Sequence, residues 1–170
     1  MKKIFLITLI LGFFLSPNSK AQQDKSQRPS PPAKVSQTLA SGAEISIDYS
    51  QPSLKGRALS SLAPVGKVWR TGANEASVFE TNKDVFIEGQ KLAAGKYSLY
   101  TIPGDKEWTI IFNKSWKQWG TVYKESEDAL RVNVKSGTSS KSVEKFTFEI
   151  AKNGTVSLLW ADTRIDFKVR

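Results

Sequence analysis

The sequence predicts an all-β protein, an antiparallel two-sheet β-sandwich of jelly-roll or immunoglobulin-like type with one short helical turn. Apolar residues recur at every second position over most of the chain, which is the pattern of strands with one buried face. Turn-forming residues recur at roughly 8–12-residue spacing, and no long helical pattern separates the strands. The long irregular segments favour crossings between two sheets over an even meander.

Each expected strand lies between turn signals. In the strand at 44–50, Ile45, Ile47 and Tyr49 share one face. Asn153-Gly154 has the strongest composition for a tight hairpin turn. The expected strands are 35–39, 44–50, 76–81, 84–88, 96–102, 107–113, 130–135, 146–150, 155–160 and 165–169.

Three segments interrupt the alternation. The segment 51–74 is rich in glycine and proline, and it contains a plausible helical turn at 60–63 that Pro64 ends. The segment 114–126 is irregular and aromatic, and 136–142 is a polar loop. Long loops of this kind are often functional.

The chain divides into three expected parts: a signal peptide at 1–21, a flexible proline-rich tether at 22–33, and a single β-sandwich domain at 34–170. The apolar run at 4–15 follows two lysines and precedes small residues suited to cleavage. It is shorter than the roughly 20 residues of a bilayer span, although an uncleaved anchor is the alternative. We therefore expect a periplasmic or secreted protein with no transmembrane segment after cleavage. Without cysteine it is not a lipoprotein.

Composition excludes several kinds of chemistry. The chain has no histidine and no cysteine, so Ser-His-Asp and Cys-His catalysis and the usual transition-metal sites are excluded. We expect no catalytic residues, no metal and no cofactor. A carboxylate pair, as in glycosidases, would still permit a hydrolase, although the spacing selects no pair. The net charge of +9 is scattered, and export argues against nucleic acid as a partner.

Two segments carry the candidate ligand-binding residues. In the segment 66–75, Trp69, Arg70, Asn74 and Glu75 lie between glycines, and Arg70 has a planar fork suited to a carboxylate, phosphate or pair of sugar hydroxyls. In the alternative reading, Arg70 pairs with an acid, Trp69 fills the core and Asn74 caps a turn. In the segment 112–120, Trp116 and Trp119 supply aromatic faces for sugar stacking, or they anchor the loop on a sheet. Arg57 is a further candidate polar contact.

Several long motifs of this chain are unusual in composition. They are Leu54-Lys55-Gly56-Arg57, Val65-Gly66-Lys67-Val68-Trp69-Arg70-Thr71-Gly72-Ala73-Asn74-Glu75-Ala76, 92–104, 107–114, Gln118-Trp119-Gly120 and 129–135. Together they resemble a bacterial domain-of-unknown-function family, the one numbered 2911. The resemblance covers 34–170 and implies an exported envelope protein of Gram-negative bacteria, without implying a reaction. It departs from the expected pattern at 121–128, which is poorer in aromatic residues and proline, and at Ala93, where proline is expected.

The sequence thus predicts a protein that binds rather than transforms its partner. The first hypothesis is a module for a small ligand or glycan, with a glycan or an acidic small molecule as the partner. The second is a protein-interaction or structural domain of the envelope. The third is a carboxylate-dependent hydrolase.

Overall fold

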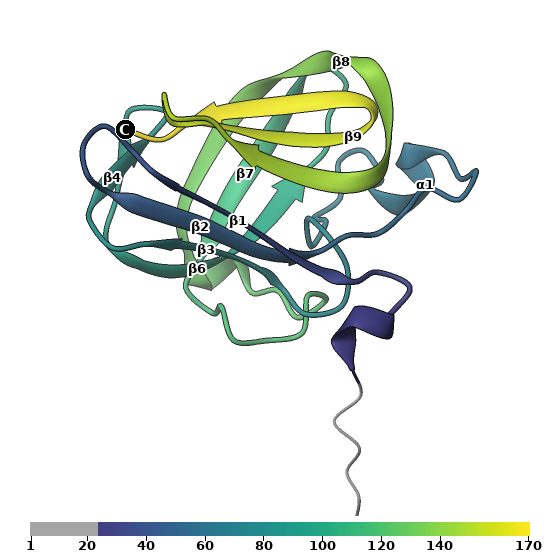
Figure 1. Cartoon of the computed structure of the whole chain (residues 1–170), viewed down its shortest axis with the longest axis horizontal. Coiled ribbons are helices and arrows are strands. Elements are labelled where there is room, and N and C mark those ends of the chain that lie inside the picture. Colours follow the sequence, from purple (N-terminus) through teal and green to yellow (C-terminus); the bar gives the residue numbers. More distant parts are fainter. Residues whose placement is uncertain (1–23) are drawn as a thin grey trace, which may run out of the picture.

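The computed structural model describes residues 24–170, which form an almost entirely β structure (Figure 1). The expected signal peptide at 1–21 lies outside the described residues. Among residues 24–170, no helix has the length and apolarity needed to cross a bilayer. The helical elements are the 3-10 turns η1 (Lys25–Gln27) and η2 (Glu125–Glu127) and the short helix α1 (Leu59–Leu62), close to the expected helical turn.

Seven strands form one antiparallel sheet in the order β1-β2-β3-β6-β7-β8-β9, and a separate two-stranded ribbon pairs β4 with β5. Apart from that inserted ribbon, each strand pairs with the next one along the chain. The strands are β1 (Pro32–Thr38), β2 (Glu44–Ser50), β3 (Ser77–Thr81), β4 (Val85–Ile87), β5 (Gln90–Leu92), β6 (Gly95–Ile102), β7 (Glu107–Asn113), β8 (Asp128–Ile150) and β9 (Thr155–Lys168).

The expected antiparallel β class is present, but the two separate sheets of a sandwich are replaced by one curled sheet with meander connections. The difference arises in β8 and β9, which are much longer than the expected strands. The expected polar loop at 136–142 lies inside β8, where Ser136 and Thr138 pair with β9. Backbone pairing, which the side-chain pattern does not report, makes this segment a strand.

The β8–β9 hairpin bends back over the rest of the sheet, so that one sheet supplies both layers (Figure 1). The register shifts between Thr138 and Val143, and Ala161 opposite Val143 has a positive φ of 54°. Irregularities of this kind bend a strand locally. The far end of the hairpin closes against the chain after β2, where Ser53 bridges to Lys145.

The core lies between these two layers. The layer formed by β2, β3, β6 and β7 contributes Ile47, Phe79 and Phe112, which are fully buried. The bent hairpin contributes Phe146 and Trp160, which are likewise inaccessible to solvent. Burial of this many large side chains is the main stabilising contribution in a chain without disulfides.

The outer face of β6 and β7 is also buried, because the segment 114–124 folds over it. We call this segment the tryptophan loop. Ser98 Oγ donates to Ser115 O at 3.1 Å, and Asn113 Nδ2 donates to Lys124 O at 2.9 Å. Polar side chains on the outer face therefore hold the loop in place, and both of these side chains are fully buried.

The chain before β1 packs on the domain as well. β1 begins at Pro32, two residues before the expected domain start, and residues 24–31 fell within the expected tether. Arg28 and Lys25 of this segment contact Glu75, and Ser30 O accepts a hydrogen bond from Asn74. These contacts place the beginning of the described chain at the same end of the molecule as the tryptophan loop (Figure 1).

Candidate functional site

The structure distributes the seven candidate ligand-binding residues over several environments. Arg57 is exposed, and its guanidinium donates to the backbone oxygens of Ser53 and Leu54 at 2.8 and 2.9 Å. Asn74, which has a positive φ of 60°, donates from Nδ2 to Ser30 O and Ser50 Oγ. Contacts within the chain therefore use the polar groups of both residues.

Trp69 belongs to the core, with only 7% of its surface exposed. Its ring stacks on Trp160 with centroids 5.4 Å apart, and it meets Phe146 and Trp108 edge-on. Its backbone bridges to Thr101 at the end of β6. This agrees with the structural reading of Trp69, in which the side chain anchors the irregular segment 51–74.

Arg70, the next residue, lines a cavity of about 380 Å³ that we call the Arg70 pocket. Alternation of side chains along an extended segment explains why Trp69 points inward while Arg70 lies at the surface. The pocket lies between the segment that contains α1 and the tryptophan loop. Its lining includes Leu62, Lys67, Val68, Arg70, Tyr100, Gly120, Thr121 and Tyr123.

The guanidinium of Arg70 is the distinctive group of this pocket. Arg70 is half-buried, yet within residues 24–170 it has no hydrogen bond or ion pair to the protein. The alternative reading, in which Arg70 pairs with an acid, is not found among these residues: Glu75 pairs with Lys25, and Asp84 pairs with Lys91. The Arg70 side chain can occupy this position because residue 120 is glycine: a Cβ at Gly120 would lie 2.8 Å from Arg70 Cδ.

Two tyrosine rings, of Tyr100 and Tyr123, form a wall of the Arg70 pocket, with ring centroids 4.8 Å apart. Tyr100 OH donates to Val122 O at 2.6 Å and accepts from Gln118 Nε2 at 3.0 Å. Because this hydroxyl is already satisfied, Tyr100 offers the pocket its ring rather than a free polar group.

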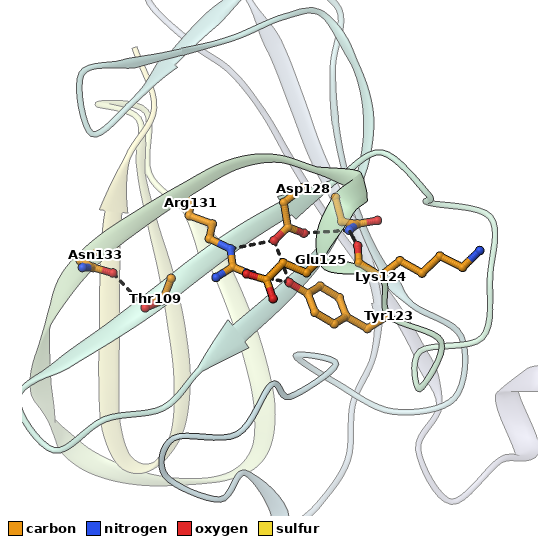
Figure 2. Close-up of polar contacts among 8 residues, drawn as sticks. Thr109, Tyr123, Lys124, Glu125, Asp128, Arg131 and Asn133 are labelled. Atoms are coloured by element: carbon orange, nitrogen blue, oxygen red, sulfur yellow. Dashed lines mark hydrogen bonds and ion pairs between the residues drawn. The ribbon is translucent and has the colours of Figure 1, made fainter.

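A polar network binds the hydroxyl group of Tyr123 (Figure 2). Its hydroxyl donates to Asp128 Oδ2 at 2.7 Å and accepts from Arg131 Nη2 at 2.6 Å. Arg131 Nε also donates to Asp128 Oδ2, at 2.7 Å, and Glu125 pairs with Arg131. Burial, followed by the hydrogen bond to Asp128, raises the pKa of Tyr123 to about 12.

Glu75 lies in a different hollow, of about 210 Å³, and does not share the Arg70 pocket. It pairs with Lys25 at 3.0 Å and with Arg28 at 2.8 Å. Desolvation raises its pKa, but hydrogen bonds from its own backbone, Lys25 and Arg28 outweigh that effect and lower the pKa overall. This carboxylate therefore fastens the chain before β1 to the domain.

Trp116 and Trp119 lie on the outer surface of the tryptophan loop and line neither of these cavities. Their exposed fractions are 38% and 48%. Lys96 Nζ lies 5.2 Å from the centroid of the Trp116 ring. The loop is anchored, as the alternative expected, but Ser98, Asn113 and Tyr100 contribute side-chain hydrogen bonds to that anchoring.

The charged side chains that line the Arg70 pocket are cations. Its lining residues include the cations Lys67 and Arg70 and no carboxylate. Among residues 24–170, no group of three or more aspartate and glutamate side chains is placed to hold a metal ion. A planar guanidinium beside aromatic ring faces suits a ligand with a carboxylate or phosphate and a flat or cyclic body.

Sequence reasoning missed Lys67, Tyr100 and Tyr123 as lining residues of this pocket. Tyr100 lies within an expected strand, and nothing local shows that the tryptophan loop covers that strand's outer face. Asp128 precedes the expected strand at 130–135 and Arg131 lies within it, and their pairing with Tyr123 depends on how the loop returns to the sheet. One signal was present in the sequence: Tyr100 is an aromatic residue that follows Lys96 and Ser98 on the face expected to be polar, and the structure buries both Ser98 and Tyr100.

Comparison with known proteins gives a family but no activity. No curated protein and no solved structure significantly matches this chain. Residues 30–169, nearly all of the described residues, match the family DUF2911, described as a protein of unknown function. The chain therefore belongs to the DUF2911 family.

Proposed function

We propose that this chain is an exported binding domain, periplasmic or secreted, whose Arg70 pocket holds a small acidic ligand such as an acidic sugar. One observation carries the proposal: Arg70, a half-buried residue, has no hydrogen-bond or ion-pair partner among residues 24–170 and lines a cavity without a carboxylate. No buried side-chain nitrogen or oxygen among these residues lacks a partner, so the unpaired guanidinium nitrogens of Arg70 are accessible and can donate to a ligand.

The size of the pocket and its remaining lining residues suit an acidic ligand about as large as a monosaccharide. A volume of about 380 Å³ is near the lower end of ligand pockets, which typically begin at roughly 300 Å³. Lys67 adds a second cation, and Tyr100 and Tyr123 supply ring faces for a sugar or another cyclic body. Because the network around Asp128 fixes the Tyr123 ring, this wall is preorganised for binding.

A matched ligand panel tests the proposal. Glucuronate, glucose 6-phosphate and neutral glucose are added to the full chain, and thermal stability and heats of binding are measured. A ligand that binds only the folded state stabilises it by about 2.7 kcal/mol at one hundred times its dissociation constant. We expect stabilisation by at least one acid and none by glucose.

Matched variants locate the site. Arg70→Gln removes the guanidinium charge and should abolish the ligand-dependent stabilisation while leaving the unliganded protein folded. Arg57→Gln is the control, because Arg57 is an exposed arginine that contacts only the backbone oxygens of Ser53 and Leu54 and does not line the Arg70 pocket. Equal loss in both variants, or no response to any acid in the wild type, would contradict the proposal.

The second candidate is a protein-interaction or structural domain of the envelope. It is favoured by the side chains of Arg57, Asn74 and Glu75, which hold loops rather than face a cavity with Arg70. This function would be supported if the chain bound no acid in the panel but crosslinked reproducibly to one envelope protein. The hydrolase hypothesis gains no support from the Arg70 pocket, which has no carboxylate in its lining.

A further inference from the structure

The tryptophan loop presents aromatic and aliphatic side chains to solvent. Side-chain hydrogen bonds from the outer face of β6 and β7, such as that from Tyr100 OH to Val122 O, hold the loop on the sheet. Trp116, Trp119 and Val122 remain 38%, 48% and 47% exposed. Three large apolar side chains gathered in one short loop mark an interaction surface.

The positive charge of this loop favours a negatively charged partner. Lys114, Lys117 and Lys124 are exposed, and the loop contains no aspartate or glutamate. Three of the neighbouring carboxylates are paired with cations: Glu75 with Lys25 and Arg28, Glu80 with Lys96, and Glu125 with Arg131. Glu127, whose backbone oxygen accepts from Lys114 N, has no ion pair among residues 24–170. The loop itself therefore carries three lysines and no acid around its aromatic rings.

We propose that the tryptophan loop docks the domain onto the surface of an anionic lipid bilayer. Tryptophan rings favour the boundary between headgroups and acyl chains, and lysines are attracted to anionic headgroups. The loop lies at the end of the domain where the described chain begins (Figure 1). Lys25 pairs with Glu75, whose backbone bridges to Trp119 of the loop.

Vesicle co-sedimentation tests the proposal with the full chain. We expect binding to vesicles of phosphatidylglycerol and phosphatidylcholine, little binding to phosphatidylcholine alone, and weakening as salt screens the lysines. The double variant Lys114→Gln/Lys117→Gln should lose affinity by roughly fivefold per lysine. Its matched control, Lys141→Gln/Lys152→Gln, removes two exposed lysines elsewhere and should bind more like the wild type.

The aromatic contribution needs its own variants. Trp116→Ala/Trp119→Ala should lower vesicle affinity by about tenfold or more, because both rings leave the interface. Phe86→Ala is the control, since Phe86 is 50% exposed on the β4–β5 ribbon. All variants keep the same N-terminus, so any contribution of the apolar run at 4–15 is common to them.

Tryptophan fluorescence provides a readout that does not depend on a variant folding. Three of the five tryptophans, Trp69, Trp108 and Trp160, are buried, so a blue shift on adding vesicles reports on Trp116 and Trp119. We expect that shift with anionic vesicles alone. The proposal would be overturned if the vesicles caused neither a blue shift nor sedimentation, or if both vesicle types bound equally. It would also be overturned if the tryptophan variant kept wild-type affinity, or if the loop bound only an acidic protein.

Discussion

The indole rings of Trp69 and Trp160 stack in the core, with centroids 5.4 Å apart and planes inclined by 17°. This contact joins the irregular segment 51–74 to β9, two parts of the chain that are far apart in sequence. It fixes the backbone of residue 69 and, with it, the position at which Arg70 emerges beside the pocket. The position of Arg70 in its pocket therefore depends on a core contact.

Replacing Trp69 with alanine should lower the free energy of unfolding by about 3–5 kcal/mol, because it leaves a large cavity among packed rings. Urea denaturation measures the change. Trp119→Ala, at an exposed position, is the control and should change stability by less than about 0.5 kcal/mol. Equal effects would mean that Trp69 is not the core anchor.

Replacing Gly120 with alanine should disturb both the fold and the Arg70 pocket. The new Cβ would lie 2.8 Å from Arg70 Cδ and 2.9 Å from Asn74 O, so at least one neighbour must move. Overpacking of this kind costs about 1–3 kcal/mol, and ligand affinity should fall with it. Calorimetry measures both changes, and Lys117→Ala is the control, because Lys117 is exposed in the same loop and does not line the pocket. Unchanged affinity in Gly120→Ala would show that the position of Arg70 does not matter.

Tyr123 should make stability depend on pH in the alkaline range. Its folded pKa of about 12 exceeds the ordinary value of 10.0, so the unfolded chain loses its proton first as the pH rises. The stabilisation that Tyr123 contributes to the folded state is therefore complete below pH 10 and is lost as the pH rises from about 10 to 12. Tyr123→Phe should flatten this part of the stability profile. The phenolate absorbance of the folded protein should also lose its latest phase in that variant, and an unchanged titration would assign the late phase to another tyrosine.

Glu75 should control how firmly residues 24–31 dock on the domain. Glu75→Gln removes the charge that pairs with Lys25 and Arg28, so backbone amides in this segment should exchange hydrogen faster. Acidification should likewise loosen the docking of residues 24–31. Because the pKa of Glu75 is lowered in the folded state, its stabilising contribution is present above the unfolded value of 4.5 and is lost as the pH falls through the folded pKa. Glu149→Gln, an acid on β8, serves as the control, and equal exchange in both variants would exclude the pairing as the cause.

Several strands could be predicted because one of their faces is buried. In β2, Ile45 and Ile47 are inaccessible to solvent while Ser46 and Asp48 face outward, which is the period that the sequence displays. The middle of β8 could not be predicted in this way. Its residues are exposed on both faces and are held by backbone pairing to β9, which leaves no periodic trace in the side chains.

The candidate site divides along the same line. The sequence by itself determined which local segments carry unusual chemistry, namely 66–75 and 112–120, because composition and spacing are local properties. Only the tertiary structure decided which side chains share a cavity. Arg70 meets Tyr100 and Tyr123 because the tryptophan loop folds over β6, whereas Glu75, five residues away, turns to Arg28. Contacts between distant segments depend on strand register and loop path, and these are set by packing of the whole sheet.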